Sequence, residues 1–176
     1  MKGAHKSISG GRLYLAGITG VLLLTALDQL TKYLAVVKIR PAGTIWLIRD
    51  ILCLEYIENR GMAFGMLEGK LAFFIILCLV FLSAMIYVYV RMPKTREYLP
   101  LAGVMALVAS GALGNLIDRV LRGFVVEFIY VSVIDFPIFN MADIYVVCGG
   151  ILLVILVCFG YKDEDFEFLR FSGKKK

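Results

Sequence analysis

The stretch LAFFIILCLVFLSAMIYVYV, residues 71–90, carries no charged residue over twenty positions. A helix of this length rises about 30 Å, which is the thickness of the hydrocarbon core of a bilayer. Apolar runs of comparable length occupy residues 13–37, 99–121 and 139–161. We therefore predict an all-α membrane protein with four transmembrane helices.

The composition supports this prediction. The chain has 176 residues, of which 60% are hydrophobic, and its mean hydropathy is +0.84. Soluble domains are closer to 45–50% apolar, and a small chain cannot bury so much apolar surface. A very apolar soluble helical bundle is the alternative. We expect one membrane domain over residues 1–176.

The first apolar run follows the basic segment MKGAHK and resembles the start of a secretory signal. It is longer than the apolar region of a signal peptide, and no convincing small-residue cleavage site follows it. We expect a retained first helix.

Lysine and arginine predict the orientation. They gather in the two tails and in the connection between the second and third runs: Lys2, Lys6, Arg12, Arg91, Lys94, Arg96, Lys162, Arg170, Lys174, Lys175 and Lys176. The positive-inside rule then places both termini in the cytoplasm. The net charge of +5 reflects this topology and contact with anionic lipid, and we expect no nucleic-acid partner.

Two segments between the runs have the character of strands. The segment TIWLIRDILCLEYIENRGMAF, residues 44–64, is rich in β-branched and aromatic residues. In residues 123–138, Val125, Glu127 and Ile129 alternate and would share one face of a strand. We predict that the two segments pair as a small extracytoplasmic sheet on the outer leaflet.

Polar residues concentrate where the apolar runs reach the outer side. Their spacings are helical: i and i+4 in the first run, one face of the third, and i and i+3 in the fourth. Each pair alone could be a neutralised structural pair or a surface charge at a helix end, but their common location favours a functional site. The residues are Asp28, Lys32, Asn115, Asp118, Arg119, Arg122, Asn140 and Asp143.

The available side chains limit the chemistry. His5 is the only histidine and lies in the N-terminal tail, which excludes Ser-His, Cys-His and HExxH zinc catalysis within the membrane. The four cysteines form no CxxC pair and are expected to be small buried hydrophobes. Two carboxyl groups in a poorly solvated site share a proton and can activate water without a metal. Asp143 and Glu127 are the natural pair.

The motifs DQLTK at 28–32, NRGMAF at 59–64, GNLIDR at 114–119 and FNMAD at 139–143 resemble the lipoprotein signal peptidases, or signal peptidase II family. The resemblance covers about residues 13–160. It implies a four-helix aspartyl endopeptidase of the bacterial cell (inner) membrane, with its active site at the extracytoplasmic face. The implied reaction removes the signal peptide of prolipoproteins before a diacylglyceryl-modified cysteine.

The resemblance also implies roles for individual residues. Asp143 matches one catalytic aspartate, and Asn140 is its supporting amide. Residues expected to line or support the site, or to hold substrate, are Asn115, Arg119, Asn59, Gly61, Asp28 and Lys32. No metal or organic cofactor is implied. The implied partners are lipid-modified prolipoproteins and membrane lipids, and we expect a monomer.

Glu127 is the main departure from the family, which has its second catalytic aspartate at this position. The added methylene displaces the carboxyl by about 1 Å, and misplacement of this order can cost about 100-fold in rate. Retreat of the strand backbone could absorb it, or Asp135 could replace it, although the IDFP sequence around Asp135 predicts a turn. Two hypotheses follow: an active peptidase with a Glu/Asp dyad, or a non-catalytic relative that binds lipidated signal-peptide helices. A Ser132–Lys32 protease and a small transporter subunit are weaker alternatives.

Overall fold

The computed structural model describes residues 7–61 and 70–170. Its long helices are α1 (Gly10–Leu34), α3 (Leu71–Arg91), α4 (Leu99–Arg122) and α5 (Met141–Ile155). A π-helical segment, Ala35–Ile39, and the short α2 (Arg40–Ala42) prolong α1, and a second π-helical segment, Leu156–Gly160, prolongs α5. All four helices are long and apolar enough to cross a membrane, which confirms the four predicted spans.

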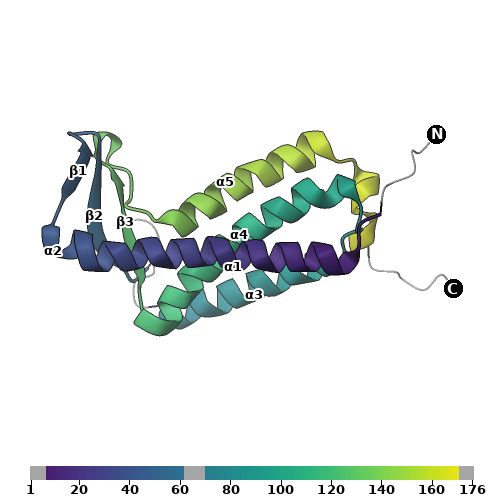
Figure 1. Cartoon of the computed structure of the whole chain (residues 1–176), viewed down its shortest axis with the longest axis horizontal. Helices are drawn as coiled ribbons and strands as arrows, with labels where there is room; N and C mark the ends of the chain where they lie inside the picture. The colour runs from purple at the N-terminus through teal and green to yellow at the C-terminus, as the bar shows by residue number, and fades with distance from the viewer. Residues whose placement is uncertain (1–6, 62–69, 171–176) are drawn as a thin grey trace.

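Helix α4 is the centre of the bundle, and α1, α3 and α5 pack against it (Figure 1). Half of the residues in its apolar window are buried, whereas only 6% of those in the window of α3 are. Two glycines allow α5 and α1 to approach α4 closely. A Cβ at Gly111 would meet the carbonyl oxygen of Ala142, and one at Gly114 would meet the carboxyl group of Asp28.

A small antiparallel sheet lies at one end of the bundle (Figure 1). Its strands are β1 (Ile45–Ile48), β2 (Leu52–Asn59) and β3 (Val125–Val131), in the order β1-β2-β3. The pairing of β2 with β3 confirms the predicted sheet, with Asn59 opposite Val125 and Ile57 opposite Glu127. The register shifts between Leu54 and Ile57, an irregularity that the sequence did not predict.

The faces of β3 follow the predicted alternation. Val126 and Phe128 pack with Ala35 and Ile39 of the first π-helical segment. Because successive side chains of a strand point to opposite faces, Glu127 is directed away from this apolar contact. Glu127 is partly buried.

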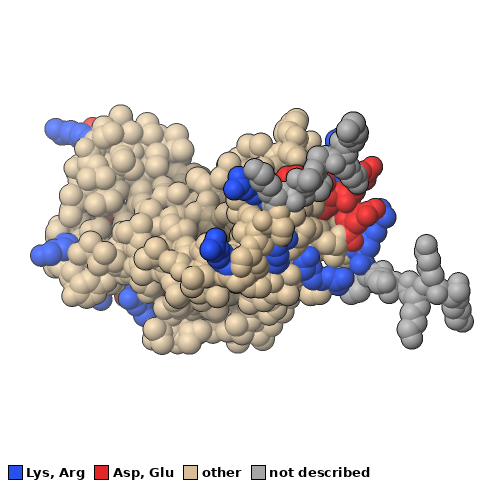
Figure 2. All heavy atoms as spheres, turned by 45° about the vertical axis from the view of Figure 1, so that its right-hand side comes forward, with Lys and Arg blue, Asp and Glu red and all other residues tan. Residues whose placement is uncertain are grey.

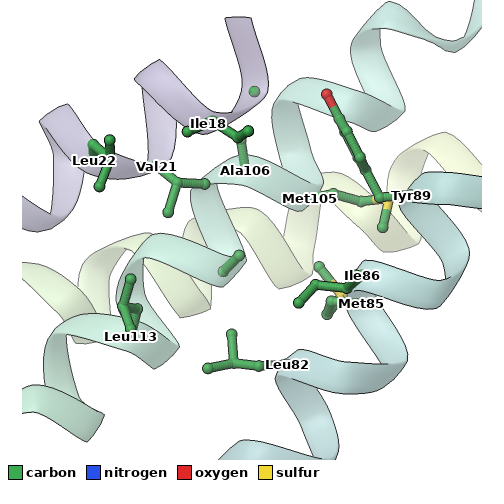
Figure 3. Close-up of a pocket in the computed structure, with 12 residues that line it drawn as sticks. Ile18, Val21, Leu22, Leu82, Met85, Ile86, Tyr89, Met105, Ala106 and Leu113 are labelled. Carbon is green, nitrogen blue, oxygen red and sulfur yellow. The ribbon is translucent and has the colours of Figure 1, made fainter. Parts of the chain in front are cut away.

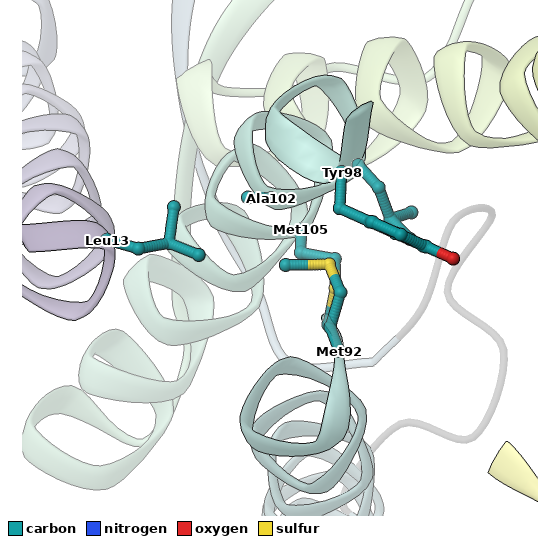
Figure 4. Close-up of a cluster of buried hydrophobic side chains, with 6 residues drawn as sticks. Leu13, Met92, Tyr98, Ala102 and Met105 are labelled. Atoms are coloured by element: carbon teal, nitrogen blue, oxygen red, sulfur yellow. The ribbon is translucent and has the colours of Figure 1, made fainter. Parts of the chain in front are cut away.

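The opposite end of the bundle has its own apolar core (Figure 4). Leu13, Met92, Tyr98 and Met105 are buried there, and Phe168 of the C-terminal segment packs against them. Both described chain ends lie at this end, and charged side chains gather around it (Figure 2). The basic residues Lys2, Lys6 and Lys174–Lys176, on which the orientation partly rests, lie outside the described residues.

Candidate functional site

A fully buried ion cluster joins α1 to α4 below the sheet. Lys32 Nζ lies 3.0 Å from Asp28 Oδ2 and 3.2 Å from Asp118 Oδ2, and none of the three side chains is exposed. The predicted Asp28–Lys32 pair is therefore confirmed. The alternative of Asp118 as a surface charge is wrong, because α1 and β3 cover the end of α4.

Additional polar groups complete this cluster. Arg122 Nη1 lies 3.4 Å from Asp118 Oδ1, one helical turn away. Gln29 Nε2 donates to Gly114 O at 3.1 Å and lies within 3.3 Å of oxygens of Asp28 and Asp118. Gln29 was not among the predicted site residues, and its place beside Asp28 in DQLTK is the only feature of the sequence that points to it. These contacts satisfy buried carboxylates that would otherwise be costly.

Asn115 links the ion cluster to Asp143. Its Oδ1 accepts hydrogen bonds from Lys32 Nζ at 2.9 Å and Asn140 Nδ2 at 3.1 Å. Its Nδ2 donates to Asp143 Oδ1 at 2.8 Å. The orientation of this amide is thus fixed by its partners, because a flipped amide would put donor against donor. Asn115 transmits the position of Lys32 to the Asp143 carboxyl.

Asn140 and Asp143 form a capping box at the start of α5. Asp143 N donates to Asn140 Oδ1 at 3.0 Å, and Asn140 N donates to Asp143 Oδ2 at 3.0 Å. The predicted fourth span began at residue 139, whereas α5 begins at Met141, because Asn140 is its N-cap. Both Asp143 oxygens are therefore held by neighbouring N–H groups.

The backbone of Val126, next to Glu127, is held from both sides. Its N–H donates to Asp118 Oδ2 at 3.0 Å, and its carbonyl accepts from Asn140 Nδ2 at 3.1 Å. We call this arrangement the Val126 clamp. Because Val126, Asp118 and Asn140 are fully buried, retreat of the strand would break hydrogen bonds that water cannot replace. The clamp thus opposes the backbone adjustment considered for the longer Glu127.

Glu127 meets Asn59 across the sheet. Asn59 Nδ2 donates to Glu127 Oε1 at 2.7 Å, and Asn59 Oδ1 accepts from Gly61 N at 2.8 Å. Burial raises the pKa of Glu127 to about 7, and the negative charge of Asp143 adds to the rise, against the lowering effects of Asn59 and Arg119. Glu127 therefore exchanges its proton near neutral pH.

Arg119 lies beside this pair. Its Nη2 lies 3.5 Å from the carbonyl oxygen of Gly61, and its guanidinium stacks over the ring of Phe74 on α3 at 5.1 Å. It thus turns toward α3, whereas Asp118 turns toward α1. Of the predicted outer-loop block, Asn59, Arg60 and Gly61 are described, and residues 62–64 lie outside the described residues.

The alternative acids and bases have other contacts. Asp135 is exposed in a left-handed turn conformation (φ 49°), where it accepts a hydrogen bond from Tyr130, as the predicted turn requires. Lys32 Nζ is surrounded by oxygens of Asp28, Asp118 and Asn115, and the hydroxyl of Ser132 is not among its partners. The geometry argues against a Ser132–Lys32 dyad. All four cysteines are free, but only Cys53 is buried. The predicted burial is wrong for Cys148 and Cys158, which are exposed on the apolar surface of the fourth span.

The fold and this site define a multi-pass membrane protein with two partly buried carboxyl groups, those of Glu127 and Asp143, held by hydrogen bonds at the sheet end of the bundle. Such a pair can act as acid and base toward water. Residues 20–159 match the family model described as signal peptidase (SPase) II. On this match the chain belongs to the signal peptidase II family.

Similar proteins agree with this assignment. The lipoprotein signal peptidase of Caldanaerobacter subterraneus is 42% identical over 140 residues, 79% of this chain and 93% of the relative. That of Rhodococcus jostii is 44% identical over 159 residues, 87% of this chain and 76% of the relative. A solved structure described as a bacterial membrane enzyme superposes with a TM-score of 0.75 at 32% identity, and covers 92% of this chain and 98% of its own.

Proposed function

We propose that this protein is an aspartyl-type endopeptidase that removes the signal peptide from prolipoproteins before a diacylglyceryl-modified cysteine. One observation carries the proposal: Asn140 bonds the Asp143 carboxyl through its N–H and the carbonyl of Val126, next to Glu127, through its side chain, which supports two carboxyl groups at one site. The relatives named lipoprotein signal peptidase supply the substrate class.

In the proposed mechanism Glu127 holds a proton and Asp143 does not. Asp143 takes a proton from water as the water oxygen bonds to the scissile carbonyl carbon. Protonated Glu127 donates a hydrogen bond to the developing oxyanion. As the C–N bond breaks, the proton on Asp143 passes to the leaving nitrogen, which restores both side chains.

Positioning follows from the surrounding contacts. Asn115 and the backbone N–H of Asn140 hold the two oxygens of Asp143, and Asn59 holds Glu127. Arg119 is a cation beside both carboxyls that can hold a substrate carbonyl. The ion cluster of Asp28 and Lys32 supports Asn115 from behind.

The proposed setting is the bacterial inner membrane, with the sheet and the carboxyl pair outside and both termini in the cytoplasm. The basic residues of the described tail end, such as Arg12, Lys94 and Lys162, support this orientation through the positive-inside rule. A prolipoprotein's lipidated cysteine at the outer surface would then lie at the level of the carboxyls. The proposed partners are these prolipoproteins and membrane lipids, bound by a monomer.

A second candidate function is that of a non-catalytic relative that binds lipidated signal-peptide helices. The observation that favours it is Glu127 itself, since the Val126 clamp opposes the backbone shift that would compensate for the longer side chain. Such a protein would still bind the lipidated signal-peptide helix but would not hydrolyse the peptide bond.

The test is cleavage of a purified, lipidated prolipoprotein in detergent, read as a gel shift, with binding measured in parallel. We expect the parent protein to cleave and Asp143→Asn to bind without cleaving. Binding without cleavage by the parent would favour the second candidate. Neither binding nor cleavage by the folded parent would refute both.

A further inference from the structure

Helix α3 has one buried side chain, that of Phe74 near its start. The exposed fraction of Phe74 is 7%, whereas that of the adjacent Phe73 is 51%. An apolar span surrounded by lipid gains little by burying its side chains, because lipid tails are as apolar as the neighbouring helices. The burial of Phe74 therefore indicates a specific contact with the rest of the protein.

The packing of α3 toward the sheet involves few side chains. An apolar groove of about 470 Å³ lies between Leu82 of α3, Val21 of α1 and Leu113 of α4 (Figure 3). On the sheet side of this groove, the thiol of Cys78 donates a hydrogen bond to Ala112 O of α4 at 3.3 Å. One turn nearer the sheet, the ring of Phe74 is the buried part of the contact with α4.

The partner of Phe74 is the guanidinium group of Arg119. The central carbon of this group lies 5.1 Å from the centre of the ring, which is within the range of a cation–π interaction. The hydrogen bonds that Arg119 donates within the described residues, to Asn115 O and Gly61 O, are both 3.5 Å long. Neutral acceptors at this distance hold a cation weakly. The ring of Phe74 is therefore a main support of the guanidinium group.

The position of Arg119 affects both carboxyl groups of the site. Its charge interacts with those of Glu127 and Asp143. Burial and the charge of Asp143 raise the pKa of Glu127 to about 7, and Arg119 opposes this rise. Asn59 of β2 and Lys32 of α1 also face Glu127 and oppose the rise. Because Lys32 is fixed in the fully buried ion cluster, Arg119 is the cation whose distance from Glu127 depends on α3.

We propose that Phe74 is a positioning residue, whose ring holds the guanidinium group of Arg119 beside Glu127 and Asp143. Helix α3 takes part in the site through this ring. The inference rests on the proposed function, since it assigns Phe74 to the support of that reaction. An apolar side chain that only filled space would hold α3 against α4 but would not attract the cation.

The first test compares Phe74→Leu with Phe73→Leu in the prolipoprotein cleavage assay from pH 6 to 9. Leucine keeps an apolar side chain but lacks the negative face of the ring. Phe74→Leu should lower kcat at pH 6 at least about threefold. It should also move the alkaline fall of the rate to higher pH, because Glu127 loses its proton less readily when Arg119 moves away.

Phe73→Leu is the matched control for this test. Phe73 packs edge-on against Phe74 and is largely exposed, so its replacement should change neither kcat nor the position of the alkaline fall. A lower kcat of Phe74→Leu with an unmoved alkaline fall would overturn the proposal, since that is the effect of a purely structural role.

A second variant keeps the shape of the ring. Pentafluorophenylalanine at position 74 has a ring whose face no longer attracts a cation. We expect the same loss of kcat and the same shift of the alkaline fall as in Phe74→Leu. Pentafluorophenylalanine at position 73 should leave both as in the parent. Parent-like behaviour of the protein fluorinated at Phe74 would overturn the proposal.

The protonation of Glu127 can also be followed without substrate, by infrared spectroscopy of the purified protein in detergent. The C=O stretching band of its protonated carboxyl is the band that Glu127→Gln removes. We expect the midpoint of its titration at higher pH in Phe74→Leu than in the parent. In an Arg119→Gln background, Phe74→Leu should leave the midpoint unchanged, because the ring acts through Arg119. A shift that persists in this background would overturn the proposal.

The two readouts separate this inference from the proposed function. A shifted midpoint in a protein that cleaves no prolipoprotein would support the positioning of Arg119 by Phe74 and refute the peptidase. Cleavage by the parent, together with equal midpoints for the parent and Phe74→Leu, would overturn the positioning and leave the peptidase intact.

Discussion

Replacement of Glu127 by aspartate tests both the proposed chemistry and the Val126 clamp. The substitution removes one methylene and shortens the side chain by about 1.3 Å, given a C–C bond of about 1.5 Å. The 2.7 Å contact between Asn59 Nδ2 and Glu127 Oε1 would lengthen to about 4 Å if the backbone stayed in place. The clamp predicts that it stays in place, because Val126 is bonded on both sides.

The expected result is a faster enzyme. If the longer side chain misplaces the acid by about 1 Å in the parent, the parent loses about 100-fold in rate, equivalent to about 2.7 kcal/mol of transition-state stabilisation. Glu127→Asp should recover most of this factor in kcat and change KM little, because the substrate-binding surface is retained.

The assay is the initial rate of prolipoprotein cleavage over a range of substrate concentrations. Glu58→Asp is the matched control: it shortens a partly buried glutamate on β2 that pairs with Arg60, and it should leave the rate within a factor of two or so. A Glu127→Asp rate equal to or below that of the parent would refute the reasoning, since it would mean that the structure already accommodates glutamate.

Three further outcomes are expected. Because the pKa of Glu127 is raised to about 7, its carboxyl keeps its proton below that pH and loses it above. The cleavage rate should therefore fall about tenfold per pH unit above pH 7. A flat profile of rate against pH from pH 6 to 9 would contradict this. Lys32→Met leaves the buried Asp28 carboxylate without a cation and Asp118 with Arg122 alone, and should cost about 3–5 kcal/mol in detergent unfolding. Lys38→Met, exposed on the same span, should cost little, and similar losses would contradict the buried cluster. Gly114→Ala pushes a methyl group into Asp28 and should lower the stability, measured by thermal melting, by about 1–3 kcal/mol. The methyl group of Gly103→Ala meets no atom within 4 Å, so this control should be neutral or stabilising in the same measurement. Equal melting temperatures of the two variants would contradict the close contact at Gly114.

The spans and the pairing of polar residues within one helix could be predicted because each depends on local periodicity. Uncharged runs give the lengths of the spans, and the spacing of Asp28 and Lys32 gives their ion pair. The sheet could also be predicted, since alternation in two segments leaves few ways to pair them. Each of these inferences needs information from only one or two neighbouring stretches.

The contacts between elements could not be predicted in this way. Spacing assigned Asp118 and Arg119 to one helix face, but it does not reveal which side chain turns to α1 and which to α3. Asn140 is both the N-cap of α5 and the hydrogen-bond donor to the Val126 carbonyl. The second role depends on where β3 lies in space, which the local sequence does not reveal. Gln29 could not be predicted for the same reason, since its side chain donates to Gly114 and Asp118 of α4 as well as to the adjacent Asp28.

The capping box at α5 has a practical consequence for the study of bound substrates. Asp143 closes the first turn of α5 in addition to its proposed role as the base, so its replacement by alanine would lower the helix stability by about 0.5–2 kcal/mol together with any effect on turnover. Asparagine retains an oxygen that can accept from Asn140 N, and so preserves the turn while it removes the proposed base. A captured enzyme–substrate complex is therefore best sought with Asp143→Asn, and a lineage that abandoned catalysis would still be under selection to keep a cap-closing side chain at this position.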